Sequence, residues 1–378
     1  MKSENNTSQK SNSPKERILS VDVLRGFDMF WLVGGTGLAL AIAKLFGEGV
    51  QDVLIPQLDH AKWIGFTFYD LIFPLFEFVM GMSVVFSLSR ILTEEGKTAA
   101  YKRLLRRFVL LFILGIIYYD GISNGWADIR VFGVLQRLAA TYLLTGILFI
   151  HFKLRGLIIV SAIVLIGYWI LNVFIPVPDT GIISITKESN WAQYIDSILL
   201  PGRKLGADGS WDVNGILSTF PATISCLFGV FASFILLNKK MEQQKKVYYL
   251  VGLGIALLLA GLSWSFSMPI IKKVWSSTYV LVAGGLSFIL MGIFYWIIDV
   301  KKQKKWTLIF VWIGVNPITI YMLRKLVDFN KIATNFVGGT TDLNSPDTIG
   351  YLIAMIMSLV MSLLLLRFLY DRKIFIKV

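Results

Sequence analysis

Charged residues, cysteine and histidine are all scarce in this sequence of 378 residues. Only 16% of the residues are charged, one residue is a cysteine and two are histidines. A single cysteine excludes an internal disulfide framework, and no Cys/His spacing typical of a zinc site is present. Walker motifs, Rossmann fingerprints and serine nucleophile elbows are missing as well. We therefore predict no metal site and no soluble nucleotide-binding fold.

Hydrophobic residues make up 55% of the chain and aromatic residues 14%, which is too apolar for a water-soluble domain of this length. Apolar runs of about 20 residues recur, each long enough to cross a hydrocarbon core of roughly 30 Å as a helix. The sequence thus predicts an all-α, polytopic membrane protein with about ten transmembrane helices. The expected spans are 24–46, 64–89, 104–120, 131–152, 156–176, 213–237, 247–267, 278–299, 306–325 and 349–370.

Lysine and arginine are distributed unevenly between the connections. If the N-terminus is cytoplasmic, the inside segments hold most of these residues and the outside loops hold few. This asymmetry predicts that both the N- and C-termini are cytoplasmic. We also expect the protein to lie in the cytoplasmic (inner) membrane. The net charge of +13 then reflects topology and contact with membrane lipids, rather than binding of nucleic acid.

The polar segments define the domain organisation. Residues 1–20 are rich in Ser, Asn and Lys, so we expect a disordered cytoplasmic tail. Residues 21–378 form a single transmembrane domain in this interpretation, with outside loops at 177–212 and 326–348. The first loop is rich in Gly, Asp and Trp and is able to cover or line a site. Glycine-rich spans permit a homo-oligomer.

Ionisable residues interrupt the second span. On a continuous helix, Asp70 and Glu77 share one face with Trp63 and Thr67, and Asp70 lies roughly 10 Å below the outer end. An unpaired charge at such a depth costs at least about 2.5 to 3.5 kcal/mol. Arg137, in the fourth span, is expected at a similar depth, and we predict that it pairs with Asp70. A structural ion pair and a direct role in chemistry both remain open.

His60 lies just before the second span, at its outer mouth. Histidine is the side chain best suited to proton transfer near neutral pH, or to transient nucleophilic attack. A solvated loop histidine is the alternative interpretation.

Two other spans carry polar residues. Asp22 and Arg25 begin the first span, and Arg106 and Arg107 are expected on the same side of the membrane. Arg25 either pairs with Asp22 or joins the other two arginines in holding a phosphate-bearing ligand. In the ninth span, the pair Asn316–Pro317 predicts a break or kink. These features fit a secondary transporter or a membrane enzyme with an outside-facing cavity.

Several short motifs occur in one order along nearly the whole chain. They are "SVDVLRG", "HAKWIGFTFYDLIFPLFEFVMGMS" and "GVLQRLAATY", followed by the weaker "WDVNGILSTFPA", "PIIKKVWSSTYV" and "NPITIYM". With these motifs the chain resembles the transmembrane acyltransferase family that includes the lysosomal heparan-alpha-glucosaminide N-acetyltransferase. We expect no counterpart of the large outside N-terminal domain of that enzyme.

The resemblance implies a function and a set of site residues. His60 corresponds to the catalytic histidine of the family. The resemblance implies an enzyme that moves an acetyl group from cytoplasmic acetyl-CoA to an amino sugar or envelope glycan outside. His60 would act as a general base or as a transient acyl carrier. A transporter or flippase for a sugar or lipid-linked glycan is the alternative. We predict catalytic roles for His60, Asp70 and Arg137, substrate contacts for Asp59, Trp63, Gln136, Trp275, Ser276 and Asn316, and acetyl-CoA contacts for Asp22, Arg25, Arg106 and Arg107.

Overall fold

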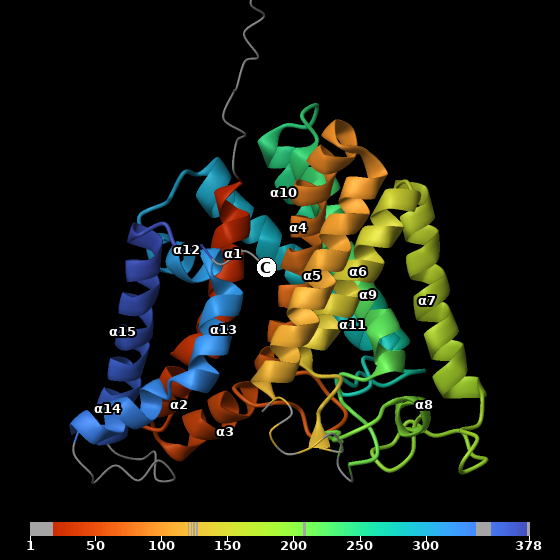
Figure 1. Ribbon diagram of the computed structural model, residues 1–378, viewed down its shortest axis with the longest axis horizontal. Helices are drawn as coiled ribbons and strands as arrows, with labels where there is room; N and C mark the ends of the chain where they lie inside the picture. The colour runs from red at the N-terminus through yellow and green to blue at the C-terminus, as the bar shows by residue number, and fades with distance from the viewer. Residues whose placement is uncertain are drawn as a thin grey trace, which may run out of the picture.

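The computed structural model describes residues 18–119, 121, 123, 125, 128–206, 209–337 and 349–375 (Figure 1). These residues are helical with no β-strand among them, apart from one isolated bridge between Arg130 and Gly202. The predicted all-α class is therefore confirmed. The elements in chain order are α1 (Leu19–Phe30), η1 (Trp31–Gly35), α2 (Thr36–Ala43), α3 (Glu48–Gln57), η2 (Phe68–Leu71), α4 (Ile72–Glu94), α5 (Gly96–Tyr118), α6 (Val134–His151), α7 (Leu154–Phe174), α8 (Trp191–Leu199), α9 (Ile216–Leu237), α10 (Gln243–Trp264), α11 (Ser277–Tyr295), η4 (Trp296–Val300), α12 (Leu308–Val315), α13 (Pro317–Leu326), α14 (Phe329–Val337) and α15 (Ile349–Asp371).

Eight helices in the described part of the chain are long and apolar enough to cross a membrane, or nine if α12 and α13 form one bent span. The multi-pass architecture is thus confirmed, with a lower count than the ten spans predicted. The difference lies at 104–120, which belongs to α5. This helix begins at Gly96, and the basic residues of its first half leave it out of a count made by composition, although it runs alongside α4 through the bundle (Figure 1).

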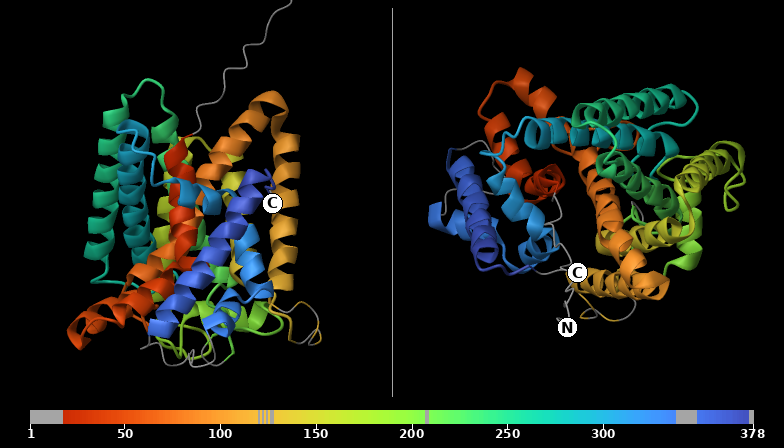
Figure 2. Two further views of the ribbon diagram at one scale, coloured as in Figure 1. Left: turned by 90° about the vertical axis from the view of Figure 1, so that its left-hand side faces the viewer. Right: turned by 90° about the horizontal axis from the view of Figure 1, so that it is seen from above.

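The most buried helices form the centre of the bundle. Most of the apolar stretch of α4, α9 and α11 is buried, whereas α7 and α10 are largely exposed and would face lipid. Figure 2 shows α15 and α7 at opposite edges of the bundle. Helices α4 and α9 approach closely, because a Cβ atom at Gly81 would collide with the carbonyl of Cys226, and one at Gly229 with the carbonyl of Phe78.

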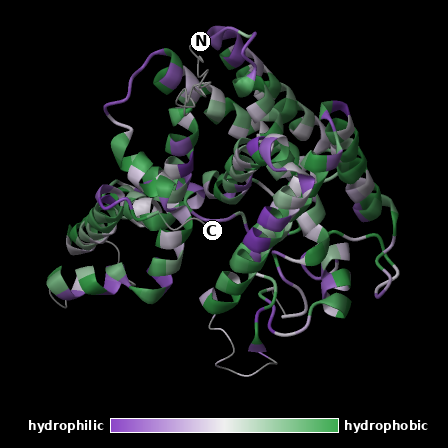
Figure 3. Ribbon diagram, turned by 45° about the horizontal axis from the view of Figure 1, so that its top comes forward, coloured by the Kyte–Doolittle hydropathy of each residue, from purple (hydrophilic) through white to green (hydrophobic). Residues whose placement is uncertain are grey.

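Two spans are interrupted. A π-helical segment, η1, separates α1 from α2 within the first span. The predicted break at Asn316–Pro317 is confirmed, since α12 and α13 meet there at an angle of 77°. Figure 3 shows hydrophobic residues along the long helices and much of the hydrophilic colour at helix ends and in the connections.

The predicted outside loops contain short helices of their own. Helix α8 lies within 177–212, and α14 lies within 326–348, of which residues 338–348 fall outside the described residues. The predicted disordered tail also falls outside them up to residue 17, and its last two residues belong to α1. Figure 1 shows α3, α8 and α14 at one end of the bundle and the α4–α5 and α9–α10 connections at the other end. This separation matches the predicted alternation, while the choice of cytoplasmic end stays a prediction.

Candidate active site

The segment before α4 folds around the carboxylate of Asp70. One oxygen, Oδ2, accepts hydrogen bonds from the Thr67 amide (3.1 Å), the Thr67 hydroxyl (3.1 Å) and the Ala61 amide (3.3 Å). Thr67 and Asp70 thereby form a capping box that starts the helix at Phe68. The predicted start at residue 64 is therefore wrong, and Trp63 and Thr67 do not share a helical face with Asp70.

The second oxygen of Asp70 holds the imidazole of His60. His60 Nδ1 lies 2.9 Å from Asp70 Oδ1, and the carboxylate is fully buried, whereas 43% of the His60 side chain is exposed. An ionised carboxylate only accepts hydrogen bonds, so we assign the proton to Nδ1 and the lone pair to Nε2. The Tyr279 hydroxyl donates to the Asp70 carbonyl (2.7 Å) and fixes the backbone from α11. A buried acceptor thus orients a histidine that remains accessible.

Lys272, in the α10–α11 connection, completes this group. Its Nζ lies 3.4 Å from Asp70 Oδ1, 2.9 Å from His60 Nδ1 and 3.2 Å from His60 Nε2. Burial lowers the pKa of Lys272 to about 8, although Asp70 opposes the shift. The two segments are joined by the Gly65 amide, which donates to the Ile270 carbonyl (2.9 Å). Gly65 has a φ of 125°, which disfavours any other residue at this position.

Arg137 does not pair with Asp70, so that prediction is wrong. The fully buried guanidinium donates to the Ser218 hydroxyl and to the Gly215 carbonyl, and it lies 4.7 Å from the ring centre of Trp275. Its electrostatic partner in α4 is Glu77. Asp70 is beyond its reach because the first turn of the helix directs that carboxylate towards the loop.

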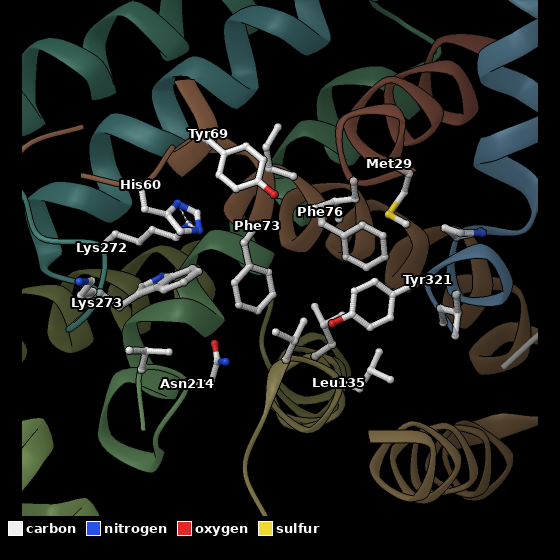
Figure 4. A pocket seen from close by; sticks show the side chains of 18 of the residues that line it. Met29, His60, Tyr69, Phe73, Phe76, Leu135, Asn214, Lys272, Lys273 and Tyr321 are labelled. Atoms are coloured by element: carbon white, nitrogen blue, oxygen red, sulfur yellow. Dashed lines mark hydrogen bonds between the residues drawn. The ribbon is translucent and has the colours of Figure 1, made fainter. Parts of the chain in front are cut away.

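A cavity of about 320 Å³ opens beside His60 (Figure 4). Its polar groups include His60, Lys272, Lys273 and Asn214, together with the hydroxyls of Tyr69 and Tyr321. Much of the remaining wall is apolar and is formed by Met29, Leu32, Phe73, Phe76, Leu135 and Leu138 among others. Of the predicted site residues, His60 and Trp275 line this cavity, and Asp70 lies directly behind His60.

The loop that presents Asn214 is held by a buried ion pair. Arg130 donates to both oxygens of Asp212, each at 2.7 Å, and both side chains are almost completely buried. Asp212 also accepts from the Asn214 amide (2.9 Å). This bidentate pair joins the 128–130 segment to the long loop and fixes the position of Asn214 at the cavity.

A second, larger cavity of about 1210 Å³ lies towards the other ends of α1 and α4. Asp22 and Arg25, two of the predicted acetyl-CoA contacts, line it, and Arg25 contacts Asp22 (3.3 Å), Ser83 Oγ (2.8 Å) and the Gly314 carbonyl (3.3 Å). The charged residues of its wall are Asp22, Arg25, Lys239, Lys246, Asp299, Lys302 and Lys304. Five cations against two carboxylates make this cavity electropositive.

Arg106 and Arg107 line neither cavity, so their predicted grouping with Arg25 is wrong. Arg106 is exposed, and Arg107 lies 4.2 Å from the ring centre of Tyr142. Both residues belong to α5, which packs mainly on α6, whereas Arg25 belongs to α1.

Five predicted substrate-contact residues also lie outside the wall of the first cavity. Asp59 accepts from the His60 amide (2.7 Å), and Trp63 donates to the Ile185 carbonyl (3.0 Å). Gln136 accepts from the Gly133 amide (3.1 Å), and Ser276 from the Tyr279 amide (3.2 Å), so both cap helices. Asn316 donates to the Ile374 carbonyl (3.0 Å). Each of these side chains therefore has a structural partner in place of an open position at the cavity.

Residues that the sequence did not single out supply much of the polar wall. Lys272 and Lys273 belong to "PIIKKVWSSTYV", and Asn214 belongs to "WDVNGILSTFPA". Both motifs contribute to the family resemblance, so they carried a signal for these positions. Among the described residues, no group of three or more His, Cys, Asp or Glu side chains is arranged to hold a metal ion.

Fold and site together define a multi-pass membrane protein with a histidine–aspartate pair at the wall of a cavity. No protein-family model matches the chain. The sequence is 28% identical to the heparan-alpha-glucosaminide N-acetyltransferase of Mus musculus over 373 residues, which covers 83% of this chain and 55% of the mouse protein. The identity to the enzyme of the same name from Homo sapiens is 29% over 363 residues, covering 81% and 52%.

The chain is thus a distant relative of these transmembrane acetyltransferases, as the motifs predicted. It spans about half the length of the curated relatives it matches.

Proposed function

We propose that this chain is a membrane acetyltransferase that moves an acetyl group from acetyl-CoA to the amino group of a sugar or glycan. The proposal rests on one observation above all, which is the contact of 2.9 Å between His60 and the buried carboxylate of Asp70 at the wall of a cavity. An imidazole held in this way keeps Nε2 available to accept a proton from an attacking amine. The distant relationship to N-acetyltransferases supports the same reaction class.

In this proposal the nucleotide end of acetyl-CoA binds in the electropositive second cavity. Arg25, Lys239 and Lys302 are among the cations that would contact its phosphates. Helices α1 and α4 line both cavities, and the walls are separated along α4 by the stretch from Phe76 to Val85, or roughly 14 Å. The pantetheine arm would cross this distance and bring the thioester to His60.

The orientation proposed for the membrane follows the basic residues. The second cavity would face the cytoplasm, where acetyl-CoA is available, and His60 would face the opposite side. The acceptor would be an amino sugar or an envelope glycan, by analogy with the glucosaminide in the names of the relatives. Acetyl transfer would then occur across the membrane.

Two catalytic routes are consistent with this arrangement. In a ternary complex, His60 acts as a general base while the acceptor attacks the thioester directly. In a double-displacement route, His60 first takes the acetyl group and then passes it to the acceptor. The routes differ in one observable, because only the second leaves an acetylated protein when no acceptor is present.

The test measures release of free CoA from acetyl-CoA by detergent-purified protein, with and without glucosamine as acceptor. We expect acceptor-dependent release by the wild-type chain and its loss in His60→Ala. His151→Ala is the matched control, because His151 is the other histidine of the chain and contacts Tyr101 at the far end of α6.

The outcomes separate the candidate functions. Equal release by His60→Ala and His151→Ala would overturn the role of His60. If the wild-type chain bound no acetyl-CoA and released none with any amino-sugar acceptor, the acetyltransferase proposal would fail and sugar transport would be the function to assay. Label from [acetyl-¹⁴C]acetyl-CoA retained on the wild-type protein, but not on His60→Ala, would identify the double-displacement route.

A further inference from the structure

Lys272 occupies a position that its contact with Asp70 alone does not explain. Asp70 already accepts three hydrogen bonds at Oδ2 and one from His60 at Oδ1, all between 2.9 and 3.3 Å. The distance of 3.4 Å between Lys272 Nζ and Asp70 is longer than any of these. Lys272 Nζ lies closer to the nitrogens of His60, and Lys272 lines the cavity. The ammonium group therefore lies against the imidazole, within 3.2 Å of both ring nitrogens, at the wall of the cavity.

The tautomer of His60 defines what Lys272 can contact. If Nδ1–H donates to Asp70, Nδ1 has no lone pair for Lys272, whereas Nε2 at 3.2 Å does. Lys272 and an incoming amine would then share the space next to Nε2. A lysine ammonium has three N–H groups, so it can turn from Nε2 towards an oxygen atom of a substrate that enters there.

We propose that Lys272 is a catalytic residue whose ammonium group stabilises the negative charge on the acyl carbonyl oxygen during transfer. This inference rests on the proposed acetyltransferase function. Fixed positive charge next to a developing oxyanion is among the largest contributions to catalysis of acyl transfer. Here Asp70 would hold the cation beside His60 before the substrate arrives, so only a turn of the ammonium group is needed to meet the developing charge.

In direct attack, one bond forms at the thioester carbon and one breaks. The acceptor nitrogen forms a bond to the thioester carbon, and the C=O π electrons move to the oxygen beside Lys272. His60 Nε2 takes the proton from the nitrogen. When the electron pair returns to carbon, the C–S bond breaks, and the CoA thiolate leaves and receives the proton from His60. Lys272 keeps its own proton throughout.

The charged groups around Lys272 decide how its activity depends on pH. Asp70 and Asp59 favour the ammonium form, burial and Arg137 oppose it, and His60 lies in direct contact. The pKa of Lys272 is about 8, so its ammonium is present below pH 8 and is lost as the pH rises through that value. We expect kcat of the wild-type chain to fall above pH 8. Lys272→Arg should move this alkaline limb upward, since arginine stays protonated.

The experiment compares Lys272→Met, Lys272→Arg and Lys62→Met in the CoA-release assay between pH 6 and 10. We expect Lys272→Met to lose roughly 100- to 1,000-fold in kcat with little change in KM for the acceptor. Lys272→Arg should retain a substantial part of kcat and its activity at alkaline pH. Lys62→Met is the matched control, because this lysine is exposed on the same loop as His60 and does not line the cavity.

A second readout does not depend on catalysis. Diethyl pyrocarbonate modifies accessible imidazole nitrogens. Lys272→Met should expose Nε2 of His60 and so speed the modification of His60 at pH 7. His151 is the internal reference, and the purification tag must contain no histidine. If the wild-type chain is active and Lys272→Met has the same kcat and the same alkaline limb as the wild type, the role of Lys272 alone is overturned. A wild-type chain without acetyl transfer would overturn the proposed function and, with it, this inference.

Discussion

Asp70 is the residue on which the proposed chemistry and the local fold both depend. Its side chain is completely buried, yet it lies at the first turn of a membrane-spanning segment, where two loop amides and one hydroxyl donate hydrogen bonds to it. The same carboxylate starts the helix and orients His60. A substitution that tests the orientation of His60 must therefore keep the shape of the Asp70 side chain, so that the start of the helix is preserved.

Asp70→Asn is that substitution. Asparagine keeps an oxygen for the amides of Thr67 and Ala61, but its amide group can donate to His60 Nδ1, which favours the tautomer with the proton on Nε2. His60 could then no longer accept a proton from the acceptor. We expect kcat to fall roughly 100- to 10,000-fold in the CoA-release assay.

Thermal unfolding in detergent should change much less, because the loop contacts remain. Asp52→Asn, on the exposed helix α3, is the control for removing one negative charge from the same end of the protein. Activity of Asp70→Asn equal to that of Asp52→Asn would contradict a role for Asp70 in orienting His60.

At the residue scale, sequence reasoning predicted a role for a side chain with distinctive chemistry and failed for a side chain that has several possible partners. His60 drew attention because proton transfer near neutral pH favours histidine. Lys272 did not, because a lysine in an outside connection counts only towards the charge asymmetry. Arg137 was assigned to Asp70 by depth alone, and the structure shows that its guanidinium contacts Ser218 and Gly215 instead.

Helices α4 and α9 depend on glycine for their contact. At Gly81 and at Gly229, a Cβ atom would overlap a backbone carbonyl of the opposing helix, and backbone cannot move aside as a flexible side chain can. Helix α4 also carries the cavity residues Phe73 and Phe76, and it continues directly from η2, which carries Asp70. The position of the site is therefore tied to the close packing of this pair.

Gly81→Ala tests this packing. The added methyl group would force α4 and α9 apart, and overpacking of this kind typically costs about 1 to 3 kcal/mol. We expect a lower thermal unfolding midpoint and less monodisperse protein on size-exclusion chromatography. At Gly252 in α10 a Cβ would meet no atom, so Gly252→Ala should leave both measurements unchanged or slightly improved. Equal behaviour of the two variants would contradict the close contact.

Element boundaries were predictable where periodicity alone sets them. Hydrophobic runs located α7, α9, α10 and α15 to within a few residues. The start of the second span was misplaced by four residues, because the capping box of Thr67 and Asp70 begins the helical segment η2 only at Phe68, and an apolar run does not reveal a cap. The break at Asn316–Pro317 was predictable because proline removes a specific helical hydrogen bond.

At the scale of the whole molecule, the two cavities lie at different depths of one bundle and differ in charge. One is largely apolar with a few polar groups around His60, and the other is lined by several lysines and an arginine. This polarity matches a reaction in which an anionic cosubstrate and a separate acceptor enter from opposite sides. Such a reaction requires that the two ends of the bundle face different compartments.

Cysteine labelling decides which end faces the cytoplasm. The chain has one cysteine, Cys226, which is completely buried in α9, so the wild-type protein should react little with a membrane-impermeant maleimide. Asp52→Cys places an exposed thiol at the His60 end, and Lys153→Cys places one at the opposite end, between α6 and α7. In intact cells we expect labelling of Asp52→Cys and not of Lys153→Cys. Permeabilised cells should label both variants. The reverse pattern in intact cells would contradict the orientation predicted from lysine and arginine, and it would place His60 on the same side as cytoplasmic acetyl-CoA.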